Sequence, residues 1–215
     1  MGSTQSERSH GAPVLGPQDL EELASPESGA AEALITSRQN ISPRRLAEPG
    51  PDLRQRERLF RAAAAAPDHG LLRPWRFVIV PHDKRRALAE TFALALIDRD
   101  PGASLEQIEA AREKAYRAPL LMLVVARLGS CEPAIPVLER MISAGCAVQN
   151  ILLSAHSMAF GSSLTSGQAM RSSRMRELFR LEGGEEAVCF INIGTVSKSK
   201  AGRVHPDAAS FVSEL

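Results

Sequence analysis

The sequence is poor in aromatic residues and in cysteine, and its charges almost cancel. Of its 215 residues, 4% are aromatic and three are cysteine, and the formal net charge is +1. A balanced charge gives no long-range field that would attract nucleic acid or an anionic membrane. The three cysteines form no C-x-x-C pair and no cluster with histidine, which argues against a zinc site. We therefore expect a partner that is a small molecule, and neither nucleic acid nor a membrane.

Long apolar runs and the common catalytic signatures are also missing. No stretch reaches the roughly 18 consecutive apolar residues of a membrane-spanning helix, and the first residues lack the apolar core of a signal peptide. We accordingly expect a cytoplasmic protein. The chain contains no G-x-G-x-x-G, Walker A loop, G-x-S-x-G elbow or H-E-x-x-H. A Rossmann-type dehydrogenase and a serine hydrolase are therefore poor interpretations.

The chain does contain enough apolar residues for one folded domain. Hydrophobic residues make up 44% and charged residues 24% of the sequence, which is ordinary for a globular protein. Residues 1–30 are rich in Ser, Gly, Pro and Glu and have no hydrophobic periodicity, so we expect a disordered N-terminal extension. The folded domain is expected over residues 31–215. Within it, Cys146 and Cys189 lie in apolar stretches and should be reduced and buried, whereas Cys131 should lie in a loop.

Helical and strand patterns follow one another along this domain. Asp52 and the pair Ser104 and Gln107 have the spacing of helix N-caps. The apolar run 120–126 is typical of a central strand that is covered on both faces. The segment 136–159 is apolar on nearly all sides, which indicates a helix buried in something larger, such as a dimer. We expect helices over 31–38, 52–66, 83–97, 104–116, 136–159 and 173–180, and strands over 77–80, 120–126, 161–166 and 187–196. This order predicts an α/β (α+β) fold with a mixed central sheet flanked by helices.

The most informative segment is the polar turn Ala66-Pro67-Asp68-His69, which is followed by Pro74-Trp75 and an apolar strand. A helix must end near this proline, and loops between a helix and a strand often carry binding groups. A second segment, Ala144-Gly145-Cys146-Ala147-Val148, lies in the long apolar helix and is followed by a bend at Gly161. In this order and spacing, over roughly residues 31–205, the segments resemble the nitroreductase family of FMN-dependent oxidoreductases, and within it the small single-domain NAD(P)H nitroreductases of the YdjA type.

This resemblance implies a fold and a reaction. The fold would be the nitroreductase-like three-layer sandwich, assembled as an intertwined homodimer with two FMN sites at its interface. The reaction would pass a hydride from NAD(P)H through bound FMN to a nitroaromatic, a quinone or a similar acceptor. No protein nucleophile and no metal are expected, because the flavin carries the redox chemistry and the protein supplies position and electrostatics.

The resemblance also implies which residues hold the cofactor. Arg38, Gln39 and Asn40 lie at the first family motif, where the rigid guanidinium of Arg38 suits the FMN phosphate. Gln39 and Asn40 stand where the family has Arg and Ser, so one cationic contact is lost. By the same resemblance, His69 contacts FMN from the partner subunit. Ala65 occupies a nearby contact position at which relatives can carry arginine.

The remaining cofactor contacts are expected near the C-terminal half of the domain. Leu164, Thr165 and Ser166 align with a Trp-Arg-Ser segment that lies along the flavin ring in the family. Because Thr165 replaces that arginine, less positive charge faces the reduced flavin, and we expect this flavin to be a weaker oxidant than in relatives with the arginine. Arg203 is expected to reach the phosphate.

Two other interpretations stay open at this point. The protein could be a flavin-binding or sensing dimer with little reductase activity, since Gln39, Ala65 and Thr165 all replace charged family contacts. It could also be a specialised reductase on the same fold, such as a flavin-dependent dehalogenase. The sequence names neither the acceptor nor the preferred nicotinamide nucleotide.

Overall fold

The computed structural model describes residues 26–129, 134–199 and 201–215. The chain divides into two compact units, one that ends at Thr36 and one that spans Ser37–Leu215. The described part of the first unit is helix α2 (Pro26–Ser37). Residues 26–30, which we assigned to the N-terminal extension, are helical. The helix formers between Ala30 and Leu34 extend the helix towards the N-terminus, since adding a turn to an existing helix is much easier than starting one. Residues 1–25, on which the rest of that prediction falls, lie outside the described residues.

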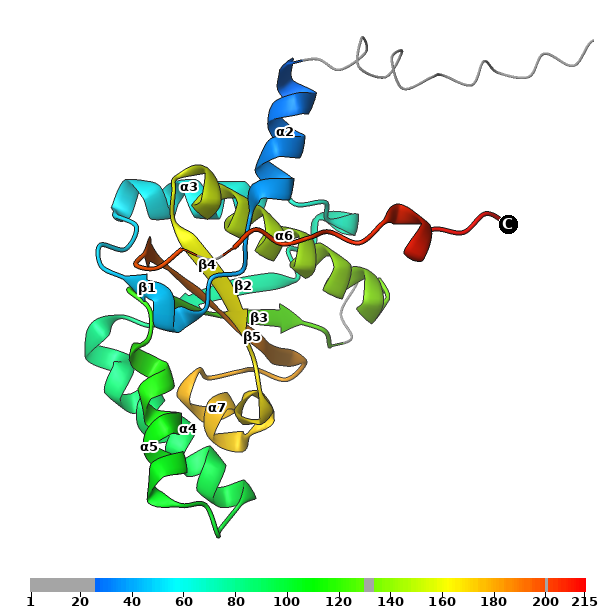
Figure 1. The fold of residues 1–215 in the computed structure, drawn as a ribbon. Helices are drawn as coiled ribbons and strands as arrows, with labels where there is room; N and C mark the ends of the chain where they lie inside the picture. Colours follow the sequence, from blue (N-terminus) through cyan, green and yellow to red (C-terminus); the bar gives the residue numbers. More distant parts are fainter. Residues whose placement is uncertain (1–25, 130–133, 200) are drawn as a thin grey trace, which may run out of the picture. The chain divides into compact units, whose positions relative to one another are not determined.

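The second unit is built on a sheet of five strands, ordered β1-β5-β3-β2, with β4 also paired to β5 (Figure 1). The strands are β1 (Leu46–Ala47), β2 (Trp75–Ile79), β3 (Leu120–Arg127), β4 (Gly161–Thr165) and β5 (Glu185–Val196). The four strand pairs are antiparallel. An isolated parallel bridge between Asn40 and Ser162 adds the one parallel pairing of the described residues. The short β1 was not expected from the sequence, because two residues give no periodicity to detect.

Strand β3 is the covered strand that its apolar run predicts. It lies between β5 and β2, and every residue from Leu120 to Ala126 is buried. Its side chains alternate between two core clusters, with Met122 in one and Leu123 in the other. Since successive side chains of a strand point to opposite faces, both faces of the sheet carry a packed core.

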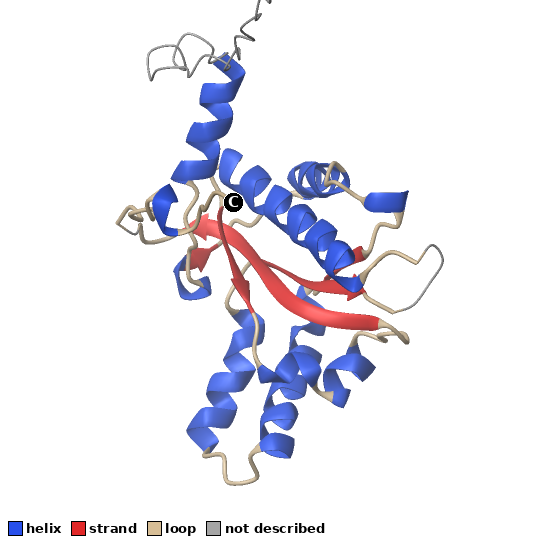
Figure 2. Ribbon diagram, turned by 90° about the vertical axis from the view of Figure 1, so that its right-hand side faces the viewer, coloured by secondary structure: helices blue, strands red, loops and turns tan. Residues whose placement is uncertain are grey.

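Helices cover the two faces and complete a three-layer sandwich (Figure 2). Helices α3 (Leu53–Ala64) and α6 (Val137–Ser157) pack on one face. Helices α4 (Arg85–Arg99), α5 (Leu105–Glu113) and α7 (Ser173–Leu178) pack on the other. This arrangement confirms the expected fold class.

Two helices begin where their caps predict. The Asp52 carboxylate accepts a hydrogen bond of 2.8 Å from the Gln55 N–H, and the Gln55 side chain accepts one of 2.8 Å from the Asp52 N–H. Ser104 and Gln107 form the same reciprocal capping box at the start of α5. Each box satisfies two backbone donors that the first helical turn leaves unpaired.

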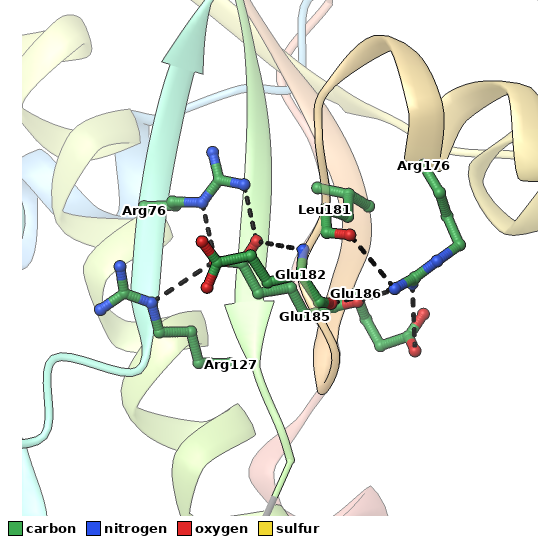
Figure 3. Close-up of polar contacts among 7 residues, drawn as sticks. All are labelled: Arg76, Arg127, Arg176, Leu181, Glu182, Glu185 and Glu186. Carbon is green, nitrogen blue, oxygen red and sulfur yellow. Dashed lines mark hydrogen bonds and ion pairs between the residues drawn. The ribbon is translucent and has the colours of Figure 1, made fainter.

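The buried carboxylate of Glu185, the first residue of β5, accepts hydrogen bonds from β2, from β3 and from the turn before β5 (Figure 3). Glu185 accepts hydrogen bonds of 2.8 and 2.7 Å from the Arg76 guanidinium, one of 3.1 Å from the Glu182 N–H and a longer one of 3.5 Å from Arg127. The bond to Arg76 is the largest influence that lowers the pKa of Glu185 to about 2. Beside it, Arg176 donates to three backbone carbonyls, those of Leu181, Glu182 and Glu185. These hydrogen bonds therefore connect the start of β5 to β2, β3 and α7.

The two described cysteines are free thiols. Cys189 is buried, and burial raises its pKa to about 11, whereas Cys146 is only half-buried. Cys131 lies outside the described residues, so its expected place in a loop stays a prediction. Among the described helices, none is both long enough and apolar enough to cross a membrane.

Candidate functional site

The segment that carries Arg38, Gln39 and Asn40 lies against the start of β4. Asn40 bridges Ser162, and the Ile41 N–H donates a 2.9 Å hydrogen bond to the Ser162 carbonyl. From Ser162 to Ser166 an extended chain rises about 13 Å, at roughly 3.3 Å per residue. The segment that carries Arg38 thus lies beside the first residues of β4, and the expected site residues Leu164–Ser166 lie at the other end of the same strand.

The Arg38 end offers an available cation. Arg38 is half-buried, and its guanidinium has no hydrogen bond or ion pair with any residue of the described chain. Gln39 is half-buried and Asn40 is exposed, so both amides are also accessible at least in part. A guanidinium with free donors beside two amides can bind a phosphate group.

The other end of β4 presents hydroxyl groups. Thr165 is half-buried, and its Oγ1 accepts a 3.0 Å hydrogen bond from the Asn192 amide, which leaves its own O–H free to donate. Ser166 is exposed, and its Oγ donates to the Val188 carbonyl at 3.1 Å. Leu164 is exposed as well. Buried beneath them on the same strand, the Ser163 hydroxyl has no hydrogen-bond partner in the described structure.

His69 lies far from the Arg38 segment within one chain. His69, in the short 3-10 helix η2 (His69–Leu71), contacts Glu139 in the first turn of α6, with 2.7 Å between Nδ1 and Oε2. Ser37, the neighbour of Arg38, contacts His156 in the last turn of α6 at 2.9 Å. The helix rises about 1.5 Å per residue, so Glu139 and His156 are roughly 26 Å apart along its axis. One chain therefore does not bring His69 and Arg38 to the same small ligand, and Ala65, four residues before His69, lies on the same α3–β2 connection.

Arg203 follows β5 in an exposed segment. Its side chain has no hydrogen bond or ion pair with another described residue, and its expected role at a phosphate stays a prediction. The chain just before it is anchored, because the Ser197 N–H donates to the Arg45 carbonyl at 2.9 Å and Arg45 donates to the Ser199 carbonyl at 3.3 Å.

Beyond Thr165 and Ser166 the structure has a cavity of about 480 Å³ that the sequence did not reveal. Arg99 at the end of α4, Lys114 just after α5, and Arg117 contribute three cations to its lining. The pKa of Lys114 is lowered, first by burial and then by the positive charges of Arg117 and Arg99. Lys114 and Arg117 are three residues apart in the chain, whereas only the packing of α4 against α5 and the segment after it brings Arg99 to them.

The fold and this site define a class of protein. Among solved structures, a nitroreductase-like family protein from Bacillus cereus superimposes with a TM-score of 0.74 at 17% identity, covering 86% of this chain and 95% of that one. The FMN-dependent nitroreductase NfnB from Mycobacterium smegmatis, solved in complex with NADPH, gives a TM-score of 0.68 at 15% identity, covering 88% and 99%. The chain therefore has the nitroreductase-like fold.

The sequence comparisons place it more narrowly. The Nitroreductase family pattern matches residues 37–195. The "Putative NAD(P)H nitroreductase" of Haemophilus influenzae is 33% identical over 186 residues, covering 86% of this chain and 99% of the relative. "Putative NAD(P)H nitroreductase YdjA" of Escherichia coli K12 is 34% identical over 190 residues, covering 86% and 98%. The chain belongs to the nitroreductase family, which confirms the resemblance identified from its motifs.

Proposed function

We propose that this protein is an FMN-dependent oxidoreductase that takes its electrons from NAD(P)H and passes them to a nitroaromatic, a quinone or a similar acceptor. When bound, FMN supplies the chemistry by accepting hydride from the nicotinamide and giving the two electrons, with protons, to the acceptor. Family membership and the names of the relatives support this proposal. The observation that carries it is the bridge between Asn40 and Ser162, which aligns a free guanidinium with the hydroxyl-bearing end of β4.

The side chains along β4 fit the cofactor. FMN has an anionic phosphate at one end and a flat ring with a polar edge at the other. Arg38 would bind the phosphate, with Arg203 as the second cation. Thr165, held by Asn192, and Ser166 would offer hydrogen bonds to the polar edge of the ring.

A second copy of the chain would complete each site. The long axis of α6 separates His69 from Arg38 by far more than a hydrogen bond within one chain. The N-terminal half of α6 also exposes large apolar side chains, with Leu138 at 76% and Ile142 at 65% of full exposure. Apolar groups gathered on one helix face are typical of a protein interface. We therefore infer a homodimer in which the His69 end of one chain meets the Arg38 end of the other.

The test is an anaerobic visible spectrum of the purified protein with FMN, recorded before and after addition of NADH and then NADPH. The proposal expects the spectrum of bound flavin and its bleaching by at least one nucleotide. Re-oxidation by an added quinone should then restore the colour. Absence of FMN binding would overturn the proposal. Flavin that binds but is reduced by neither nucleotide would replace it with the flavin-binding or sensing dimer.

A further inference from the structure

The cavity beyond Thr165 combines an apolar floor with a cationic rim. Its floor is formed by side chains from the sheet and from α4, namely Phe92, Leu96, Leu121 and Phe190. Its rim carries the three cations Arg99, Lys114 and Arg117. Phe92 and Phe190 meet edge to face, with ring centroids 5.6 Å apart. A flat apolar ring with a negative substituent is the ligand shape that such a surface complements.

The positive charges at the rim are not balanced by acidic side chains that line the cavity. No aspartate or glutamate is among the described residues that line the cavity. Arg117 has one carboxylate neighbour, Glu113, at 3.6 Å, whereas Arg99 and Lys114 have no ion pair with any described residue. Three neighbouring cations with one acidic partner repel one another, and the pKa of Lys114 is lowered first by burial and then by the charges of Arg117 and Arg99. An incoming anion would relieve this repulsion.

The backbone that carries two of these cations, Lys114 and Arg117, is also held in place. The Arg85 guanidinium is buried and donates to the carbonyls of Val80, Ala115 and Pro119 at 2.8, 2.6 and 3.1 Å. These bonds fasten the segment that carries Lys114 and Arg117 to the start of α4. A preorganised rim loses less conformational entropy when it binds a ligand than a mobile one would.

We propose that this cavity is the acceptor subsite and that it selects aromatic acceptors bearing a carboxylate. This proposal rests on the proposed function. The ring would lie on the apolar floor next to Thr165 and Ser166, where the flavin ring is expected, and the carboxylate would lie among Arg99, Lys114 and Arg117. A volume of about 480 Å³ lies in the range of small-molecule sites and suits a molecule of this kind.

The first experiment compares two acceptors that differ in charge, para-nitrobenzoate and para-nitrobenzyl alcohol, with the flavin-loaded enzyme. The measured quantity is the ratio of kcat/KM for the anion to kcat/KM for the alcohol, because the ratio cancels any general loss of activity. Lys114→Gln and Arg117→Gln should each lower the ratio by roughly three- to tenfold, as expected for one partly solvated charge-assisted contact. Lys114→Arg, which keeps the charge, should retain most of the preference. Arg86→Gln, an exposed cation of α4 outside the cavity lining, is the matched control.

A second readout is independent of turnover. Titration calorimetry with benzoate and with benzyl alcohol should show binding of the anion that weakens in the Lys114 and Arg117 variants and at higher ionic strength. Equal binding of both compounds by the wild-type protein would overturn the inference. It would also be overturned if the variants raised the KM for NADPH but left the acceptor ratio unchanged, since the cations would then serve the nucleotide phosphate. If benzoate binds as expected but neither nucleotide reduces the flavin, the proposed function fails while the anion subsite stands.

Discussion

Replacing Glu185 with glutamine should destabilise the fold by an amount that depends on pH. The pKa of Glu185 is lowered from 4.5 to about 2, mainly by its hydrogen bonds from Arg76. Each pKa unit corresponds to about 1.4 kcal/mol, so the ionised carboxylate contributes about 3 kcal/mol to the free energy of unfolding. Because the folded-state pKa is the lower one, this contribution is complete above pH 4.5 and is lost as the pH falls towards 2.

The assay is urea unfolding at fixed protein concentration, at pH 7 and at steps down to about pH 2.5. Glu185→Gln should lower the free energy of unfolding by about 3 kcal/mol at pH 7, and the difference from wild type should shrink below pH 4.5. Glu186→Gln is the matched control, since that neighbouring carboxylate is exposed and lies 3.8 Å from Arg176 in a solvated pair. Its effect should stay within about 1 kcal/mol. Curves for the Glu185 variant and wild type that run parallel across this pH range would refute the reasoning.

Three further predictions concern the cofactor and the dimer. Arg38→Gln should weaken FMN binding roughly tenfold in a flavin fluorescence titration, whereas the exposed neighbour Arg44→Gln should not, and equal affinities would remove Arg38 from the site. Ile142→Glu should shift the protein towards a monomer in light scattering and lower its flavin content in parallel, because a charge would enter the inferred interface. Thr165→Arg should raise the flavin midpoint potential by some tens of millivolts in a spectroelectrochemical titration, and an unchanged potential would contradict the expected effect of the missing charge.

Local signals in the sequence predicted local structure well. Asp52 and Ser104 begin their helices because a cap needs only a side chain and the backbone three residues on. The apolar run of β3 located a covered strand for a similar reason, since burial on both faces leaves no polar alternation.

Contacts between residues that are far apart in the chain could not be predicted from the sequence. Nothing around Asn40 indicates its bridge to Ser162, and nothing around Lys114 and Arg117 indicates that Arg99 shares their cavity. Nor does the sequence show that Arg85 is buried, because a buried arginine is recognised only by the three carbonyls that surround it. Family resemblance supplied the expected site residues along β4, whereas the charged rim of the neighbouring cavity required the tertiary structure.

The position of β5 in the chain has a consequence for biosynthesis. This strand pairs with β1, β3 and β4, and it is the last strand of the described chain. Until residues 185–196 leave the ribosome, β3 has β2 as its only partner in the final sheet, and neither β1 nor β4 has its partner strand. The nascent chain must therefore carry an apolar strand with an open edge from the synthesis of β3 until that of β5, which is a state that attracts chaperones and aggregation.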